Sequence, residues 1–171
     1  MRKDIFILLC FLMGFFQSSP TMAQIEVIFS PEGVIKENLF KEMESTTSSL
    51  DLAIHDITSH KLAQTLLKAK GRGVKVRIIA DSTQAKKKSS QITLMIHQGI
   101  LIKVLGGKEQ GAMNHRFAIL DGKKVITGSF DWSGAYEKRD YENILILQDS
   151  EVVASYQKEF DWLWRLKRVI R

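Results

Sequence analysis

Two polar residues suited to phosphate chemistry open a stretch that otherwise has the pattern of a β-hairpin. The stretch is AMNHRFAILDGKKVITGSFDWS, residues 112–133, and it places Asn114, His115 and Arg116 just before an apolar run. An arginine guanidinium can hold a phosphate through two parallel hydrogen bonds. An asparagine amide has no lone pair basic enough to attack phosphorus or to carry a proton. The stretch therefore indicates phosphate binding, and of these three residues only His115 could act as a nucleophile.

Strand alternation decides which of these side chains share a face. Successive residues of a strand point to opposite faces, so Asn114 and Arg116 lie on one face and His115 lies on the other with Phe117. A one-residue bulge would turn His115 inward as a substitute nucleophile. Regular alternation favours a structural, hydrogen-bonded role for His115 instead.

Hydrophobic periodicity and turn signals predict the elements that must position this hairpin. Strands are expected over 25–30, 49–57, 74–81, 100–105, 114–121, 124–129 and 142–147, and helices over 59–73 and 149–166. A further helix is expected to start with Ser30 as N-cap and Pro31 in the first helical position, because apolar residues follow at helical spacing.

The order of these elements predicts one α/β domain over residues 24–171. The opening strand-helix-strand-helix-strand order implies crossover connections and parallel strands, whereas the hairpin adds antiparallel ones. We therefore expect a mixed, largely parallel sheet flanked by helices. A chain of 171 residues with 44% hydrophobic residues is long enough for one sizeable core.

The first 23 residues have the pattern of a cleavable secretory signal. Arg2 and Lys3 precede an apolar run over 5–16, and the polar stretch after that run ends in a small residue, Ala23. The run is shorter than the about 20 residues that cross a bilayer. We expect a secreted or periplasmic protein, and an uncleaved N-terminal membrane anchor is the alternative.

Charge and residue usage narrow the classes of function. The formal net charge is +6, which favours a polyanionic partner such as nucleic acid or anionic lipid. The densest basic run, 86–88, fits either a solvated loop or a binding segment. The one cysteine, Cys10, lies inside the expected signal, so thiol chemistry is not expected in the mature protein. The four histidines lack paired ligand spacing, so we expect no metal and no cofactor.

Whole segments of the chain resemble one known family. The segments are FSPEG, SLDLAIHDIT, LLKAKGRGVKVRIIAD, QGILIKV, MNHRFAILDGKKVITGSFDWS, YENILIL and FDWLW. In this order they resemble the small single-motif members of the phospholipase D superfamily, which include secreted bacterial endonucleases and mitochondrial-surface phosphodiesterases. The resemblance implies a homodimer in which each subunit contributes a motif H-x-K-x-x-x-x-D to one shared site. It also implies a metal-free reaction through a phosphohistidine, with the second histidine as the acid.

The motif itself departs from the family pattern. It reads Asn114-x-Arg116-x-x-x-x-Asp121, so its histidine and lysine are both replaced. The resemblance implies that Ser129 contacts phosphate and that Glu142 orients the residue at the histidine position. Asp131 stands where the family has asparagine and brings a negative charge toward the phosphate. The candidate catalytic residues are therefore Asn114, His115, Arg116, Asp121 and Glu142, and the candidate phosphate-binding residues are Arg116, Ser129 and Asp131.

Two further features have more than one interpretation. His55 ends a strand at the edge where α/β proteins bind ligands, so it either compensates for the missing histidine or caps the strand. Trp162, Trp164 and the basic residues after them fit either a membrane interface or a C-terminal helix packed on the sheet.

Together these features predict a phospholipase D-like domain that binds phosphodiesters and hydrolyses them weakly or not at all. Nucleic acid is the expected first partner and anionic phospholipid the second, held through Arg116, Lys123 and the 86–88 run with a steep dependence on salt. A phosphodiesterase with an altered mechanism, a catalytically inactive binding protein and an envelope interaction protein stay open as alternatives.

Overall fold

One seven-stranded sheet with helices on both faces organises the computed structural model, which describes residues 24–31, 34–132 and 139–167. The strands are β1 (Gln24–Phe29), β2 (Ser49–Ile54), β3 (Lys75–Asp81), β4 (Leu101–Leu105), β5 (Arg116–Leu120), β6 (Lys124–Gly128) and β7 (Asn143–Gln148). The helices are α1 (Ile35–Ser45), α2 (His60–Gly71), α3 (Ile92–His97) and α4 (Ser150–Arg165), with 3-10 turns η1 (Gln84–Lys86) and η2 (Lys108–Gln110). The expected signal segment, 1–23, lies outside the described residues. Within the described ranges, no helix is long and apolar enough to span a bilayer.

The strand order β1-β7-β6-β5-β2-β3-β4 makes the sheet mixed, as expected. The pairs β2–β3 and β3–β4 are parallel, as their crossover helices α2 and α3 require. The other four pairs are antiparallel, because the hairpin β5–β6 lies beside β2, and β7 and β1 extend the sheet from it. Parallel pairs are therefore fewer than the opening strand-helix order predicts.

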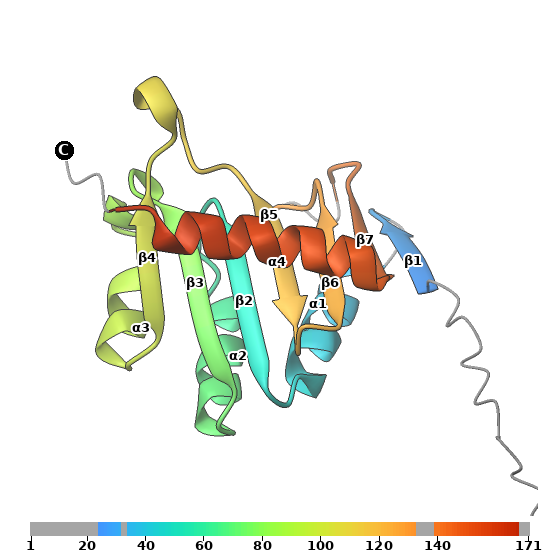
Figure 1. Ribbon diagram of the computed structural model, residues 1–171. Coiled ribbons are helices and arrows are strands. Elements are labelled where there is room, and N and C mark those ends of the chain that lie inside the picture. The colour runs from blue at the N-terminus through green and yellow to red at the C-terminus, as the bar shows by residue number, and fades with distance from the viewer. Residues whose placement is uncertain (1–23, 32–33, 133–138, 168–171) are drawn as a thin grey trace, which may run out of the picture.

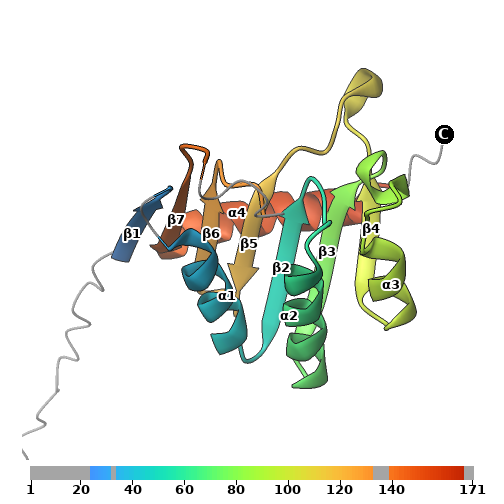
Figure 2. The same cartoon turned by 180° about the vertical axis from the view of Figure 1, so that it is seen from behind.

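Helices cover the two faces of the sheet unequally. Helix α4 crosses one face, and α1, α2 and α3 lie on the other (Figures 1 and 2). Alternate residues of β5 contribute to the two resulting cores: Phe117 packs on the α4 side and Ala118 on the other. The helical spacing of Ile35, Leu39 and Met43 correctly predicted a buried face of α1, since all three side chains are fully buried.

Helix α1 begins later than its sequence signals indicate. Val34 is its N-cap residue, and no side chain caps the helix. Ser30 is instead buried, and its hydroxyl donates to the Asp140 carbonyl at 2.6 Å and accepts from the Glu142 N–H at 3.0 Å. The serine predicted as a helix cap therefore ties the end of β1 to the segment that precedes β7.

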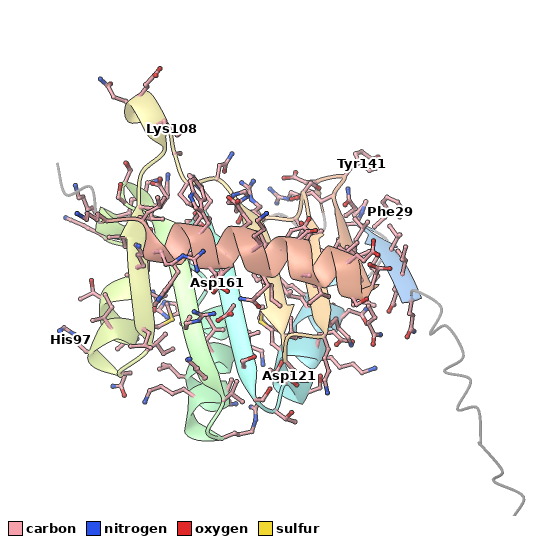
Figure 3. The ribbon with its side chains drawn as sticks, viewed as in Figure 1. Phe29, His97, Lys108, Asp121, Tyr141 and Asp161 are labelled. Atoms are coloured by element: carbon pink, nitrogen blue, oxygen red, sulfur yellow. The ribbon has the colours of Figure 1, made fainter. Side chains whose placement is uncertain are left out.

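Strand β1 forms one edge of the sheet. It pairs with β7 from Gln24 opposite Gln148 to Phe29 opposite Asn143. The Phe29 side chain is 64% exposed and lies at this edge in Figure 3. The beginning of the described chain is thus joined directly to its last strand.

Arginine 77 of β3 fixes α4 to the sheet. Its Nε and Nη2 donate to the two carboxylate oxygens of the buried Asp51 at 2.7 and 2.5 Å, and Nη2 also donates to Asp161 of α4 at 3.2 Å. The guanidinium lies over the Trp164 ring, 5.4 Å from its centroid. The prediction that the C-terminal helix packs its tryptophans on the sheet is therefore confirmed for Trp164. Trp162, by contrast, is 45% exposed.

Asp121 lies at the opposite end of β5 from Arg116, at the lower edge in Figure 3. A strand of this length separates the two residues by roughly 16 Å, at about 3.3 Å per residue. The Asp121 carboxylate accepts hydrogen bonds from the N–H groups of Thr47, Ser48 and Ser49. Burial alone would raise the pKa of this carboxyl, but the hydrogen bonds outweigh burial and hold the pKa well below its usual range. The expectation that Asp121 belongs to the site is corrected: it anchors the segment before β2.

The first prediction concerns this anchor. Asp121→Asn retains a residue that tolerates the positive φ of 52° found here but removes the charge that the hydrogen bonds stabilise. We expect the free energy of unfolding at pH 7 to fall by about 1–3 kcal/mol, measured by urea denaturation.

The pH dependence follows from the lowered pKa. Because the folded-state pKa lies below the unfolded value near 4, the stabilisation is complete above that value and is lost as the pH falls through the folded pKa. The difference between wild type and variant should therefore shrink at low pH. The exposed Glu26→Gln is the control with equal charge change. An Asp121→Asn loss no larger than the control's would contradict the assignment.

Candidate functional site

Most of the candidate residues meet at one edge of the sheet, the upper edge in Figure 1. Strands β5 and β7 start there and β6 and β2 end there, because β5 is antiparallel to both neighbours and β7 is antiparallel to β6. This edge carries Asn114, Arg116, Ser129 and Glu142, and we call it the motif edge. His55 follows the end of β2 and lies at the same edge. Antiparallel pairing thus brings residues from four strands together.

The backbone of Met113 is held on both sides, which positions Asn114 after it. Asp81, buried at the end of β3, accepts from the Met113 N–H at 3.1 Å. The His55 ring Nδ1 lies 3.2 Å from the Met113 carbonyl oxygen. A carbonyl can only accept, so Nδ1 carries the hydrogen. Strands β2 and β3 therefore both fix the start of the motif, and His55 has a structural contact.

Sequence analysis did not identify Asp81. The available signal was a carboxylate at the end of an otherwise apolar strand, which requires partners when buried. Asp81 satisfies this requirement by also accepting from the N–H groups of Thr83 and Gln84, at 2.8 and 3.0 Å. The partner that matters for the site, Met113, lies 32 residues further along the chain.

His115 lies on the α4 side of the sheet, as strand alternation predicts. Its Nε2 is 3.3 Å from Oε1 of Glu159 in α4, and its ring meets the Phe117 ring edge-on at 5.4 Å. Arg116 alternates with Phe117 and is half-buried, and Asn114 is exposed just before β5 begins. No bulge turns His115 toward Asn114 and Arg116, so the hydrogen-bonded interpretation of His115 is correct.

A loop after β6 presents Ser129 and Asp131. The Glu142 carboxylate accepts from the Asp131 N–H at 3.1 Å and from the Ser129 hydroxyl. The Ser129 oxygen in turn accepts from the Asn143 N–H at 3.1 Å. In the described part of the chain, no hydrogen bond joins Glu142 to Asn114. Within one subunit, Glu142 therefore orients the loop after β6 and does not contact Asn114.

Carboxyl groups crowd the motif edge and perturb each other. Burial raises the pKa of the Asp56 carboxyl, the negative charge of Asp131 raises it further, and the cations Lys87 and Arg116 oppose the rise. Burial also raises the pKa of Glu142; the hydrogen bond from the Asp131 N–H opposes this rise and the Asp131 charge adds to it. Asp131 and Arg116 thus act on the same group with opposite signs.

The arrangement supplies one cation for a phosphate and two carboxyl groups able to exchange protons. Arg116 can neutralise a phosphodiester, whereas the single hydroxyl hydrogen of Ser129 already goes to Glu142. Residues 24–31, 34–132 and 139–167 contain no group of three or more histidine, cysteine or acidic side chains arranged to hold a metal ion. Lys123 lies in the β5–β6 turn at the far edge, so its expected contribution to this site is corrected.

The second prediction concerns the charges at the motif edge. Asp131→Asn should lower the pKa values of Asp56 and Glu142, because it removes a negative charge that raises both. Lys87→Gln should raise the pKa of Asp56, because it removes a cation that lowers it. Carboxyl carbon shifts followed by NMR titration measure these changes. Shifts of Asp56 in the same direction in both variants would contradict the arrangement.

Comparison with known proteins agrees with this fold. Residues 39–164 match the family described as "Cardiolipin synthase, PLD-like domain". The mitochondrial cardiolipin hydrolase of Chlamydomonas reinhardtii is 36% identical over 120 residues, which cover 70% of this chain and 53% of that protein. The chain spans about half the length of the mitochondrial cardiolipin hydrolases that it matches.

Two solved structures share the fold. The phospholipase D family member Nuc from Salmonella typhimurium matches with a TM-score of 0.75 at 23% identity, over 85% of this chain and 99% of that chain. TrmBL2, an archaeal chromatin protein whose structure shows a mode of DNA binding, matches with a TM-score of 0.60 at 22% identity, over 85% and 55%. Given the family match over residues 39–164 and the 36% identity to a cardiolipin hydrolase over 70% of the chain, the chain belongs to the phospholipase D superfamily.

Proposed function

We propose that this protein binds the phosphodiester backbone of nucleic acid at the motif edge and hydrolyses it weakly or not at all. The observation that carries the proposal is the pairing of a retained cation with a replaced nucleophile. Arg116 stands at the start of β5 beside the Ser129 loop, while Asn114 occupies the place of the family's histidine. Binding needs only the cation and the donors, whereas the covalent reaction needs the imidazole.

Neither nearby histidine takes the place of the motif histidine. His115 faces Glu159 on the α4 side, and His55 donates its Nδ1 hydrogen to the Met113 carbonyl. The raised pKa values of Asp56 and Glu142 suit proton exchange. General acid-base help contributes roughly 100-fold to 10,000-fold, which falls far short of an enzyme's full acceleration.

The distribution of cations supports an extended polyanion. Lys86, Lys87 and Lys88 are exposed in the loop that follows β3, whose end lies at the motif edge. Lys108 is carried on the projection that rises above this edge in Figure 3. Several cations along one edge suit a nucleic-acid strand better than a single headgroup. Anionic phospholipid is the second candidate, because the mitochondrial relatives are named for cardiolipin.

The third prediction tests the binding. Arg116→Gln and Lys87→Gln should each weaken binding of a single-stranded 20-mer and reduce the slope of log affinity against log salt by about 0.7, since each removes one phosphate contact. Fluorescence anisotropy between 50 and 200 mM salt is the measurement.

Lys123→Gln is the matched control, because it makes the same change of charge at the far edge. It should leave the affinity nearly unchanged. Equal losses in Lys123→Gln and Arg116→Gln would show that binding follows overall charge and not the motif edge. Binding to cardiolipin vesicles but to no oligonucleotide would replace the partner with the second candidate, and binding to neither would favour an envelope interaction protein.

The fourth prediction concerns catalysis. Asn114→His combined with Arg116→Lys and Asp131→Asn restores the family's residue types. We expect the wild type to hydrolyse bis(p-nitrophenyl) phosphate without metal near the background rate, and the triple variant to exceed it by at least about 100-fold. The family arrangement needs two copies of residues 114–116 at one site, so we propose that both proteins are homodimers, which light scattering checks.

Two outcomes would contradict this account of the missing activity. Wild-type turnover at the rate of the triple variant, abolished by His55→Ala or His115→Ala, would mean that a displaced histidine carries the reaction. A folded, dimeric triple variant without any activity would mean that the motif edge no longer accepts a phosphodiester.

A further inference from the structure

A pocket opens beside the motif edge, on the α4 side of the sheet. It has a volume of about 380 Å³, within the range of sites that take small organic groups. The start of β5, the end of β6 and the middle of α4 line it. Arg116 contributes to this lining, so the pocket adjoins the residue proposed to hold a phosphate. A nucleoside or other group attached to a phosphate at Arg116 would therefore lie next to this pocket.

Aromatic rings form the apolar part of the pocket. Phe117 is buried, and the rings of His115 and Tyr156 both meet it edge-on, at centroid distances of 5.4 and 4.9 Å and interplanar angles of 65° and 71°. The His115 and Tyr156 rings are therefore both steeply inclined to the Phe117 ring that they share as a neighbour. Rings in this arrangement offer stacking surfaces to a planar group.

The pocket also contains one carboxylate. Glu159 lines the pocket, and its Oε1 pairs with His115 Nε2 at 3.3 Å. Within the described residues, Oε2 of Glu159 accepts no hydrogen bond. An ionised carboxylate only accepts, so this oxygen selects a ligand that carries an N–H or O–H donor. The pocket thus combines stacking rings with a carboxylate acceptor, and it adjoins Arg116 at the motif edge.

We propose that this pocket holds a nucleobase with an exocyclic amino group, belonging to the nucleotide whose phosphate lies at Arg116. Cytosine, adenine and guanine present such an amine, and carboxylates recognise it by accepting from it. Thymine and uracil carry a carbonyl oxygen where cytosine carries its amine, and a carboxylate repels that oxygen. The inference rests on the proposed function and assigns to it a base preference read by Glu159 and Tyr156.

The test compares three single-stranded 12-mers with one backbone: oligo-dC, oligo-dT and an abasic strand. Wild type should bind oligo-dC about tenfold more tightly than oligo-dT, the effect of one good base contact. Glu159→Ala should bring this ratio close to one. Tyr156→Ala should weaken both base-bearing strands toward the abasic strand, and Tyr156→Phe should not, because it keeps the ring. The ratio of affinities is insensitive to a general loss of folded protein.

Glu151→Ala is the matched control, since Glu151 is an exposed residue in the first turn of the same helix and does not line the pocket. It should retain the preference. Salt-dependent binding with equal affinity for oligo-dC and oligo-dT would overturn the inference and leave the proposed function standing. No binding to any of the three strands would overturn both. Displacement of oligo-dC by phosphatidylcholine vesicles, lost in Glu159→Ala, would assign the pocket to a cationic headgroup and overturn the nucleobase.

Discussion

The hydrogen bonds that hold the backbone of Met113 are the constraint on which the rest of the motif edge depends. Asp81 is 1% exposed, so its carboxylate must be fully satisfied within the fold. It reaches this state by accepting from two residues of its own loop and from Met113 of a distant segment. His55 donates to the carbonyl of the same residue, Met113. The buried Asp81 carboxylate therefore fixes the position of the backbone just before β5.

Two opposing electrostatic requirements meet at this edge. A phosphate needs positive potential, which Arg116 and Lys87 provide, whereas Asp131 brings a negative charge within reach of Asp56 and Glu142. The backbone N–H of Asp131 is nevertheless the group that holds Glu142 in place. The orienting contact thus comes from the backbone N–H of Asp131, whereas the perturbing charge comes from its side chain.

Sequence reasoning succeeded where the determining interactions are local. The opposite orientations of His115 and Phe117 relative to Arg116 follow from the two-residue period of a strand, and the structure shows them. Sequence reasoning failed where residues of one motif were expected to lie close together in space. Asp121 belongs to the same motif as Arg116, yet a strand of five residues separates them and places them at opposite edges. Contacts between distant segments, such as Glu159 with His115, leave no local pattern to read.

The position of β1 has a consequence for the order in which the molecule is assembled. Its partner in the sheet is β7, so the pair from Gln24 opposite Gln148 to Phe29 opposite Asn143 joins the two ends of the described chain. During synthesis, β1 is made before the other described strands but finds its neighbour β7 only when nearly all of the described chain is available. Until then the backbone N–H and C=O groups of β1 have no neighbouring strand to pair with. Of the described strands, the first to be made is therefore the last to be paired.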